Sequence, residues 1–143
     1  MEGNVTARDL SASDILAAED RKTVKLYVPE WGGNVYLRTI SGTERDEFEK
    51  TLLVERLELN AQGLPEMKEV QDLSNIRAKL LVRVLCDAEG KSIFTADHIA
   101  ALGAKSAAAL TRVYNKASEL NKVSDKDIKE LAGNSDGEAT ATL

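Results

Sequence analysis

The 143 residues, 43% hydrophobic and 30% charged, predict one soluble domain, because a chain of this length buries roughly two-thirds of its unfolded surface around a single core. Aromatic residues make up only 4%, so that core must consist mostly of Leu, Ile, Val and Ala. No apolar run approaches the ~20 residues that cross a bilayer, and the N-terminus lacks the basic and apolar blocks of a signal peptide. A net charge of −5 argues against nucleic-acid binding.

The first segment of the chain is polar and aperiodic, and residues 1–13 are expected to be mobile. Ser11 and Asp14 have the Ser-x-x-Asp spacing of a helix cap just before Ile15-Leu16. The segment is therefore either a short helix or a coil that becomes ordered only on docking, and the sequence leaves both alternatives open.

A β-hairpin is predicted over residues 23–40, where apolar residues alternate with polar ones on both sides of a Pro-Glu-Trp-Gly-Gly-Asn turn. We expect a four-residue loop at 30–33, although a tight turn at Gly32-Gly33 would shift the register by two residues and keep the same faces. The preferred register pairs Val28 with Val35, Leu26 with Leu37, Tyr27 with Tyr36, and Lys25 with Arg38.

Three main helices are predicted after the hairpin. The first begins at Ser41 and ends in the loop residues 60–65, with an apolar stripe of Phe48, Leu52, Leu53 and Leu57. The second begins at Val70 and is the predicted centre of the core, because its apolar residues follow the 3.6-residue period. These residues are Leu73, Ile76, Leu80, Leu81, Val84 and Leu85. The third spans 106–121, with Ala107, Leu110, Val113, Ala117 and Leu120 facing inward.

Short elements complete the predicted domain: a turn at 87–91, a helix from Ala96 to Leu102 capped by Thr95, and a last helix containing Ile128 and Leu131. Residues 133–143 are small and polar and are predicted to be disordered. The resulting fold class is α+β, with an N-terminal β-hairpin packed against a bundle of three main helices plus short helices. Residues 1–132 are expected to form this single domain.

Residues suited to chemistry are few. Aligning Gly90 with the glycine of a calcium loop puts Leu85 and Ala96 where Asp and Glu ligands belong, so no EF-hand is predicted. The single histidine, His98, lacks a partner for base catalysis and fits a helix-cap position better. The single cysteine, Cys86, follows an apolar face and fits a small buried hydrophobe in a reducing cytoplasm. We therefore predict no catalytic, cofactor or metal site.

The hairpin offers the best candidate binding residues. Trp31 lies at its tip and is either tucked onto the core or offered to a partner. Tyr27 and Tyr36 lie on its outer face, which stays uncovered if the helices pack on the Val/Leu face. We accordingly predict that Tyr27, Trp31 and Tyr36 bind a protein partner.

An ordered series of short motifs runs through most of the chain: DILAAED at 14–20, VYLR at 35–38, GTERDEFE at 42–49, LVRVLCDAEGKSIFT at 81–95 and IAALGAKS at 99–106. Together they resemble the small tail assembly chaperones of long-tailed, siphovirus-type bacteriophages and prophages. The resemblance covers about residues 14–132 and rests on this series of motifs, with no catalytic signature.

The resemblance implies a non-enzymatic role without a cofactor. Members of this family bind the tape-measure protein, keep its helical segments soluble, help to recruit tail tube subunits and associate with themselves. They act in the host (bacterial) cytoplasm and are absent from the mature virion. No motif of this chain assigns partner contacts to individual residues, so none are carried over.

The alternative is a small nucleic-acid-binding or regulatory protein of a phage or bacterium. It would use the basic side chains on the second predicted helix, which are Arg77, Lys79 and Arg83. On an acidic chain these side chains are better explained as a solvated helix face.

Overall fold

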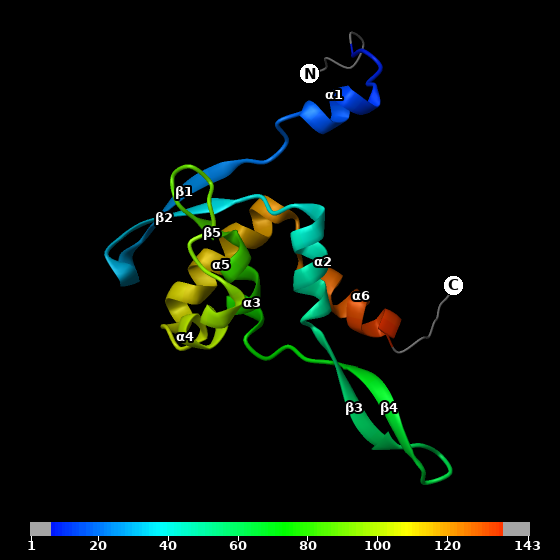
Figure 1. Cartoon of the computed structure of the whole chain (residues 1–143). Helices are drawn as coiled ribbons and strands as arrows, with labels where there is room; N and C mark the ends of the chain where they lie inside the picture. The colour runs from blue at the N-terminus through cyan, green and yellow to red at the C-terminus, as the bar shows by residue number, and fades with distance from the viewer. Residues whose placement is uncertain (1–6, 136–143) are drawn as a thin grey trace.

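The computed structural model describes residues 7–135 as a three-stranded sheet, a separate two-stranded hairpin, and helices on one side of the sheet (Figure 1). The predicted α+β class is confirmed. The strands are β1 (Thr23–Val28), β2 (Gly33–Arg38), β3 (Leu53–Leu59), β4 (Pro65–Gln71) and β5 (Leu85–Cys86). The helices are α1 (Ala12–Ala17), α2 (Gly42–Lys50), α3 (Ile76–Val84), α4 (Ile99–Gly103), α5 (Ala107–Asn121) and α6 (Asp125–Ser135), with short 3₁₀ turns η2 (Pro29–Trp31) and η3 (Ala96–His98).

The N-terminal hairpin is present, but its register differs from both predicted alternatives. Leu26 lies opposite Val35, two residues from the preferred pairing with Leu37 and in the direction opposite to the tight-turn alternative. The reason is the connection: η2 forms a single 3₁₀ turn, and Gly32 closes it with a φ of +69°, a left-handed conformation that glycine adopts readily. A shift of two residues keeps every side chain on its predicted face.

The true register removes the repulsion that the prediction implied. Arg38 lies opposite Thr23 and not opposite Lys25. Its guanidinium donates to the carbonyl of Arg83 at 2.9 Å and to the carboxylate of Glu44 at 2.6 Å. Arg38 thus joins the sheet to the end of α3 and the start of α2.

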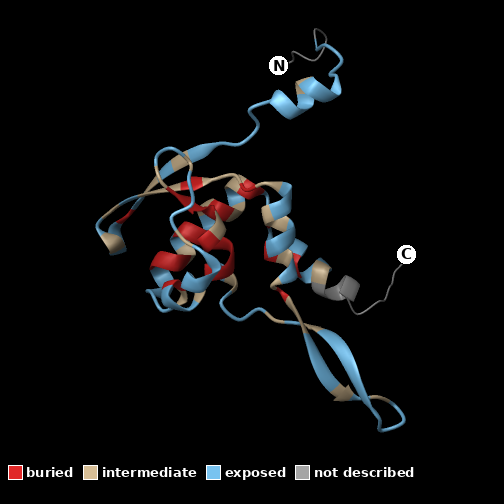
Figure 2. Cartoon of the chain, in the orientation of Figure 1, coloured by how far each residue is buried: buried red, intermediate tan, exposed pale blue. Residues whose placement is uncertain are grey.

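Helix α3 lies at the centre of the core, as predicted. Leu80, Leu81 and Val84 are fully buried, and α5 packs against them with Val113 and Ala117, also fully buried (Figure 2). Figure 2 shows burial concentrated on α3 and α5, while α1 and the β3–β4 hairpin are mostly exposed.

The predicted start of this helix at Val70 is wrong. Val70 belongs to β4, and α3 begins only at Ile76. Between them, the Asp72 carboxylate accepts from both the backbone N–H and the hydroxyl of Ser74. Such a local turn competes with helix formation and leaves Leu73 exposed.

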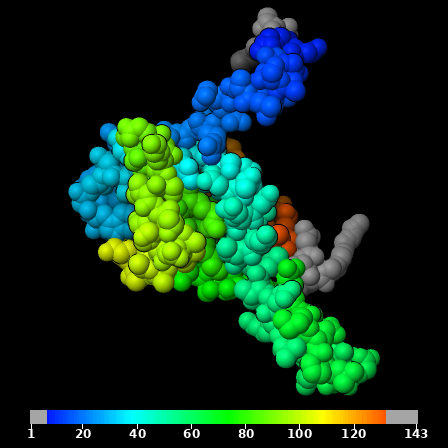
Figure 3. All heavy atoms as spheres, in the orientation of Figure 1, coloured from blue at the N-terminus to red at the C-terminus, as the bar shows by residue number. Residues whose placement is uncertain are grey.

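The predicted first helix is also wrong beyond Lys50, where α2 ends. The chain continues as the β3–β4 hairpin (residues 53–71), which projects from the body (Figure 3). Leu53 and Leu57, predicted on a helical stripe, lie on β3. Gly63 sits in the connecting turn with a φ of +78°. We call this element the projecting hairpin.

A buried lysine holds the base of the projecting hairpin. Lys79 on α3 is 9% exposed, and its ammonium donates to the carbonyl of Thr51 at 3.0 Å and lies 3.5 Å from the Asp72 carboxylate. Thr51 and Asp72 flank the two strands, and the Asp72 N–H also donates to the carbonyl of Leu52 at 2.7 Å. One cation therefore binds both ends of the hairpin to the core helix.

A buried asparagine joins the sheet to α5. The Asn121 side-chain oxygen accepts from the N–H of Ile40 at 2.8 Å, and its amide nitrogen donates to the carbonyls of Arg38 and Ala117 at 3.2 and 3.1 Å. These bonds satisfy the backbone where the chain leaves β2 and turns into α2. Without them, buried polar groups would be left unpaired.

The helix caps predicted at Ser11 and Thr95 are confirmed, and three further helices are capped in the same way. The hydroxyls of Ser11, Ser41, Thr95, Ser106 and Ser124 each accept a backbone N–H in the turn that follows. Of the two alternatives for the segment after Ser11, the structure therefore has the helix. In α5, the predicted inward positions are buried or half-buried with one exception: Ala107 is exposed, and Ala109 and Tyr114 are buried instead.

The chain ends lie partly outside the described residues. Helix α6 continues to Ser135, past the predicted boundary at residue 132. The mobility predicted for residues 1–6 and the disorder predicted for residues 136–143 concern segments that the structure does not describe. Within residues 7–135, no helix has the length and apolar character needed to span a membrane.

Replacing Asn121 by Ala should lower the free energy of unfolding by about 2–3 kcal/mol, because the N–H of Ile40 and the carbonyl of Arg38 lose their buried partner. Urea unfolding followed by circular dichroism measures the change. Asn115→Ala is the matched control on the same helix, where an exposed asparagine should cost less than ~0.5 kcal/mol. Equal stabilities of the two variants would contradict the role assigned to Asn121.

Glu44 should contribute to acid unfolding. Partial burial acts to raise its pKa, but the backbone N–H of Ser41 and the charge of Arg38 outweigh burial and hold the pKa below its usual 4.5. The unfolded carboxyl therefore takes up a proton first, and stability present above about pH 5 is lost as the pH falls through the folded pKa. Glu44→Gln keeps a capping side chain at this position and should show a shallower loss of stability between pH 5 and 3. If stability falls with pH equally steeply in the wild-type protein and in Glu44→Gln, the role assigned to Glu44 is contradicted.

Candidate partner-binding surfaces

Large apolar side chains that the fold leaves uncovered form two groups. A few exposed apolar residues are normal on any protein, but contiguous groups mark sites of interaction. The groups are Leu10, Ile15 and Leu16 near α1, and Leu57, Leu59, Leu64 and Met67 on the projecting hairpin, while Tyr27, Leu73 and Ile93 are exposed singly.

The structure brings two of the three predicted binding residues onto one face. Tyr27 lies opposite Asn34 and is 59% exposed, and Tyr36 lies opposite Lys25 and is half-buried. The two tyrosines are thus diagonal neighbours on the outer face of β1 and β2. The Lys25 ammonium lies 5.8 Å from the centre of the Tyr36 ring, which gives this face a cation–π contact.

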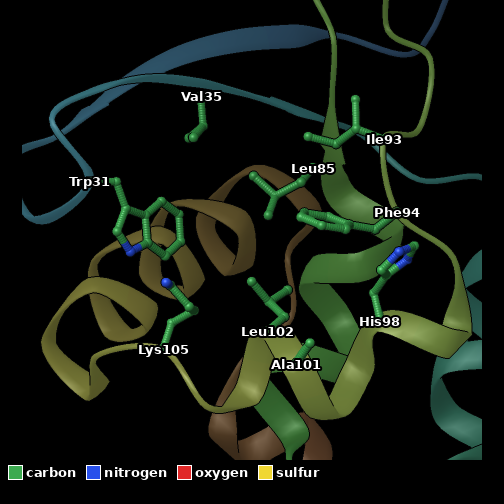
Figure 4. A pocket seen from close by; sticks show the side chains of 9 residues that line it. All are labelled: Trp31, Val35, Leu85, Ile93, Phe94, His98, Ala101, Leu102 and Lys105. Carbon is green, nitrogen blue, oxygen red and sulfur yellow. The ribbon is translucent and has the colours of Figure 1, made fainter.

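Trp31 is separated from the tyrosines, because η2 turns its ring inward. The ring packs against the core and forms one wall of a cavity of about 330 Å³ (Figure 4). Glu30 fixes η2 to α5 through two hydrogen bonds from the Arg112 guanidinium, at 3.1 and 3.0 Å. Of the two alternatives for Trp31, packing on the core is therefore the observed one, with an edge of the ring left at the cavity.

The cavity, which we call the apolar pocket, is assembled from four parts of the chain. They are η2, β2, β5 with the segment after it, and the stretch from η3 through α4 to Lys105. The lining residues are Trp31, Val35, Leu85, Ile93, Phe94, His98, Ala101, Leu102 and Lys105. No sequence pattern predicts the pocket, because its walls are up to seventy-four residues apart and no motif links them.

Three of the lining residues carry polar groups: Trp31, His98 and Lys105. The indole N–H of Trp31 is buried and has no hydrogen-bond partner. Lys105 is exposed, and Figure 4 shows its ammonium directed toward the indole nitrogen. The pocket therefore combines an apolar interior with an unsatisfied donor and a cation, both of which suit a hydrogen-bond acceptor of negative charge.

His98 and Cys86 take structural positions. The Nδ1 atom of His98 accepts from the N–H of Thr95 at 3.0 Å, and its ring meets Phe94 edge-on with 5.3 Å between ring centres. Cys86 is 3% exposed, and burial raises the pKa of its thiol. Among residues 7–135 there is no group of three or more His, Cys, Asp or Glu side chains able to hold a metal ion.

The basic side chains of α3 do not form the solvated face that the sequence suggested. Lys79 is buried at the base of the projecting hairpin, and the Arg83 guanidinium donates to the carbonyl of Lys79 at 2.6 Å. Only Arg77 is exposed, and its guanidinium lies 5.8 Å from the centre of the Tyr114 ring. The three residues therefore offer little surface to a nucleic acid.

A sequence profile described as phage tail assembly chaperone matches residues 7–134, nearly the whole chain. The chain belongs to this family. The resemblance inferred from the short motifs is thereby confirmed, and the protein has the role of a phage tail assembly chaperone.

The solved structure of the bacteriophage HK97 tail assembly chaperone is similar to this chaperone. The TM-score is 0.50 at 19% sequence identity, over 79% of this chain and 95% of that one. At this identity the likeness concerns the fold alone. Comparison with curated protein sequences found no match.

Trp31→Ala should lower the free energy of unfolding by about 2 kcal/mol, because a half-buried ring is removed from the core edge. Tyr27→Ala should cost less than ~1 kcal/mol, since that ring is mostly exposed. Urea unfolding of both variants measures the difference. A Trp31→Ala protein as stable as Tyr27→Ala would mean that the ring does not pack as described.

Proposed function

We propose that this chaperone binds the tape-measure protein, keeps its apolar helical segments soluble and helps to recruit tail tube subunits. We further propose that copies of the chaperone associate with one another in the host cytoplasm and leave before the virion is complete. Family membership supports this proposal. The structure of residues 7–135 also supports it, because large apolar side chains are left uncovered and no three metal-ligating side chains lie together.

The projecting hairpin is the observation that carries the proposal. Its end exposes Leu57, Leu59, Leu64 and Met67, each between 58% and 72% exposed, and none of them belongs to the core. Leu57 and Met67 lie directly opposite each other, so their side chains share one face of the hairpin. An apolar face at this distance from the core contributes nothing to folding unless a partner covers it.

The charges of the hairpin also favour a partner. Like charges lie directly opposite each other at three cross-strand positions, an arrangement that destabilises an isolated hairpin. The pairs are Glu55 with Glu69, Arg56 with Lys68, and Glu58 with Glu66. A bound segment with alternating charges would relieve this repulsion. An amphipathic helix supplies both the apolar stripe and the flanking charges.

Replacing Leu57 and Met67 together by Ser should weaken capture of the tape-measure protein by at least about tenfold, since two apolar side chains lose their burial on binding. The measurement is co-expression of the two proteins, followed by quantification of soluble tape-measure protein and of co-purified complex. The thermal unfolding midpoint should stay unchanged, because neither side chain contacts the core.

Arg56→Ser with Lys68→Ser is the matched control, because this pair occupies the neighbouring position on the opposite face of the same hairpin. It should retain capture of the tape-measure protein. A second double variant, Tyr27→Ala with Tyr36→Ala, tests the tyrosine face predicted from the sequence. Loss of capture in that variant alone would move the site from the projecting hairpin to the sheet, and unchanged capture in all three would contradict both surfaces.

A further inference from the structure

Helix α1 is an amphipathic element that packs against no other part of the described chain, although Arg21 and Lys22 after it are hydrogen-bonded to Glu44 and Thr39. Helix α1 is closed by a complete capping box between Ser11 and Asp14, so its local structure is well specified. Yet none of its residues is buried, and Leu16 is 87% exposed. We call residues 7–22 the N-terminal arm; Figures 1 and 3 show it extending away from the body.

A six-residue helix is too short to be stable in water by its own hydrogen bonds. The apolar side chains of the arm, Leu10, Ile15 and Leu16, therefore suit a binding role. Acidic residues accompany them: Glu19 and Asp20 follow the helix and make no ion pair within the described part of the chain. The arm thus presents bulky apolar groups next to negative charge.

The apolar pocket offers the complementary chemistry. Its lining is almost wholly apolar, and Ile93 at its edge is 51% exposed. Besides the imidazole of His98, its polar groups are the unpartnered indole N–H of Trp31 and the cation of Lys105, which forms no ion pair with any residue in 7–135. A segment suited to this pocket carries apolar side chains next to an acid. The N-terminal arm carries both.

We propose that the N-terminal arm of one copy docks into the apolar pocket of a second copy. Leu16 and Ile15 enter the cavity, and the acids after α1 meet Lys105 and the indole N–H of Trp31. This inference rests on the self-association proposed above and names the two surfaces that carry it.

The arm does not lie in the pocket of its own chain. It joins the start of β1, and from there it extends away from the body (Figures 1 and 3). In this position it can meet the pocket of a second copy without any rearrangement of its own chain.

Docking of this kind is head-to-tail. Each copy gives one arm and receives one, so the contact is heterologous and propagates until it closes into a ring or continues as an open chain.

Two variants separate the two sides of the contact. Leu16→Glu breaks the arm, and Ile93→Glu breaks the pocket by adding a charge that also repels the acidic arm; both positions are exposed, so folding is spared.

Mixing of the variants tests the geometry. Analytical ultracentrifugation of the wild-type chain should show association, and each variant alone should associate at least tenfold more weakly. An equimolar mixture should form heterodimers and nothing larger, because only one intact arm and one intact pocket remain. Larger assemblies in the mixture, unaltered association of either variant, or a monomeric wild-type chain at every concentration would overturn the proposal.

A peptide of residues 7–22 tests the contact directly. Trp31 is the sole tryptophan of the chain and lines the pocket, so its fluorescence reports occupation. Titration of the peptide into the full-length Leu16→Glu protein should shift the emission saturably, and the same peptide carrying Leu16→Glu should not. No shift with the native peptide would overturn the proposal even if the tape-measure protein is still captured.

The tape-measure protein could occupy the same pocket, and co-purification distinguishes the two occupants. Ile93→Glu should retain capture of the tape-measure protein while losing self-association. Loss of capture with unchanged self-association would assign the pocket to the tape-measure protein and refute docking of the arm. Circular dichroism of Ile93→Glu, which should match the wild-type spectrum, confirms that the variant is folded.

Discussion

The buried ammonium of Lys79 constrains the rest of the structure. Helix α3 is enclosed by the sheet and by α2, α4 and α5, so a cation on it needs partners that the core cannot supply. The carbonyl of Thr51 and the carboxylate of Asp72 provide them, at the two ends of the projecting hairpin. The hairpin must therefore begin and end against α3, and its strands can only extend outward. A polar group in the core thus determines where apolar surface is exposed.

The sequence predicted those elements whose apolar periodicity matches the burial of their residues in the structure. The central role of α3, the capping residues and the faces of the first hairpin were all predicted, because each depends on neighbours within a few residues. The register was not, since a 3₁₀ turn at η2 and a regular four-residue loop leave the same faces buried. Only the left-handed backbone conformation of Gly32 distinguishes these two connections. The partner of Arg38 was likewise missed, because Glu44 meets it across the turn from β2 into α2, where neither strand nor helix periodicity relates two residues six apart.

The projecting hairpin shows why local patterns fail where tertiary contacts decide. Glu recurs in β3 and β4, and this residue favours helices over strands. The alternation of Leu53, Leu57 and Leu59 with charged residues was a signal for a strand, but a helical stripe through Leu52 and Leu53 explained part of it equally well. The apolar pocket had no sequence signal at all, because it forms only when η2, the segment after β5 and α4 come together.

The uncovered apolar surfaces are kept apart from one another. The N-terminal arm and the projecting hairpin leave the body separately, and the apolar pocket lies beneath the sheet (Figures 1 and 4). Contiguous apolar surface of this total extent would favour nonspecific aggregation, whereas small areas flanked by acids and lysines can each select a partner. The net charge of −5 adds a general repulsion between copies, which a specific contact such as Leu16 in a neighbouring pocket must overcome. Scarce aromatic residues and an acidic surface thus suit a chain that binds other proteins transiently while they assemble.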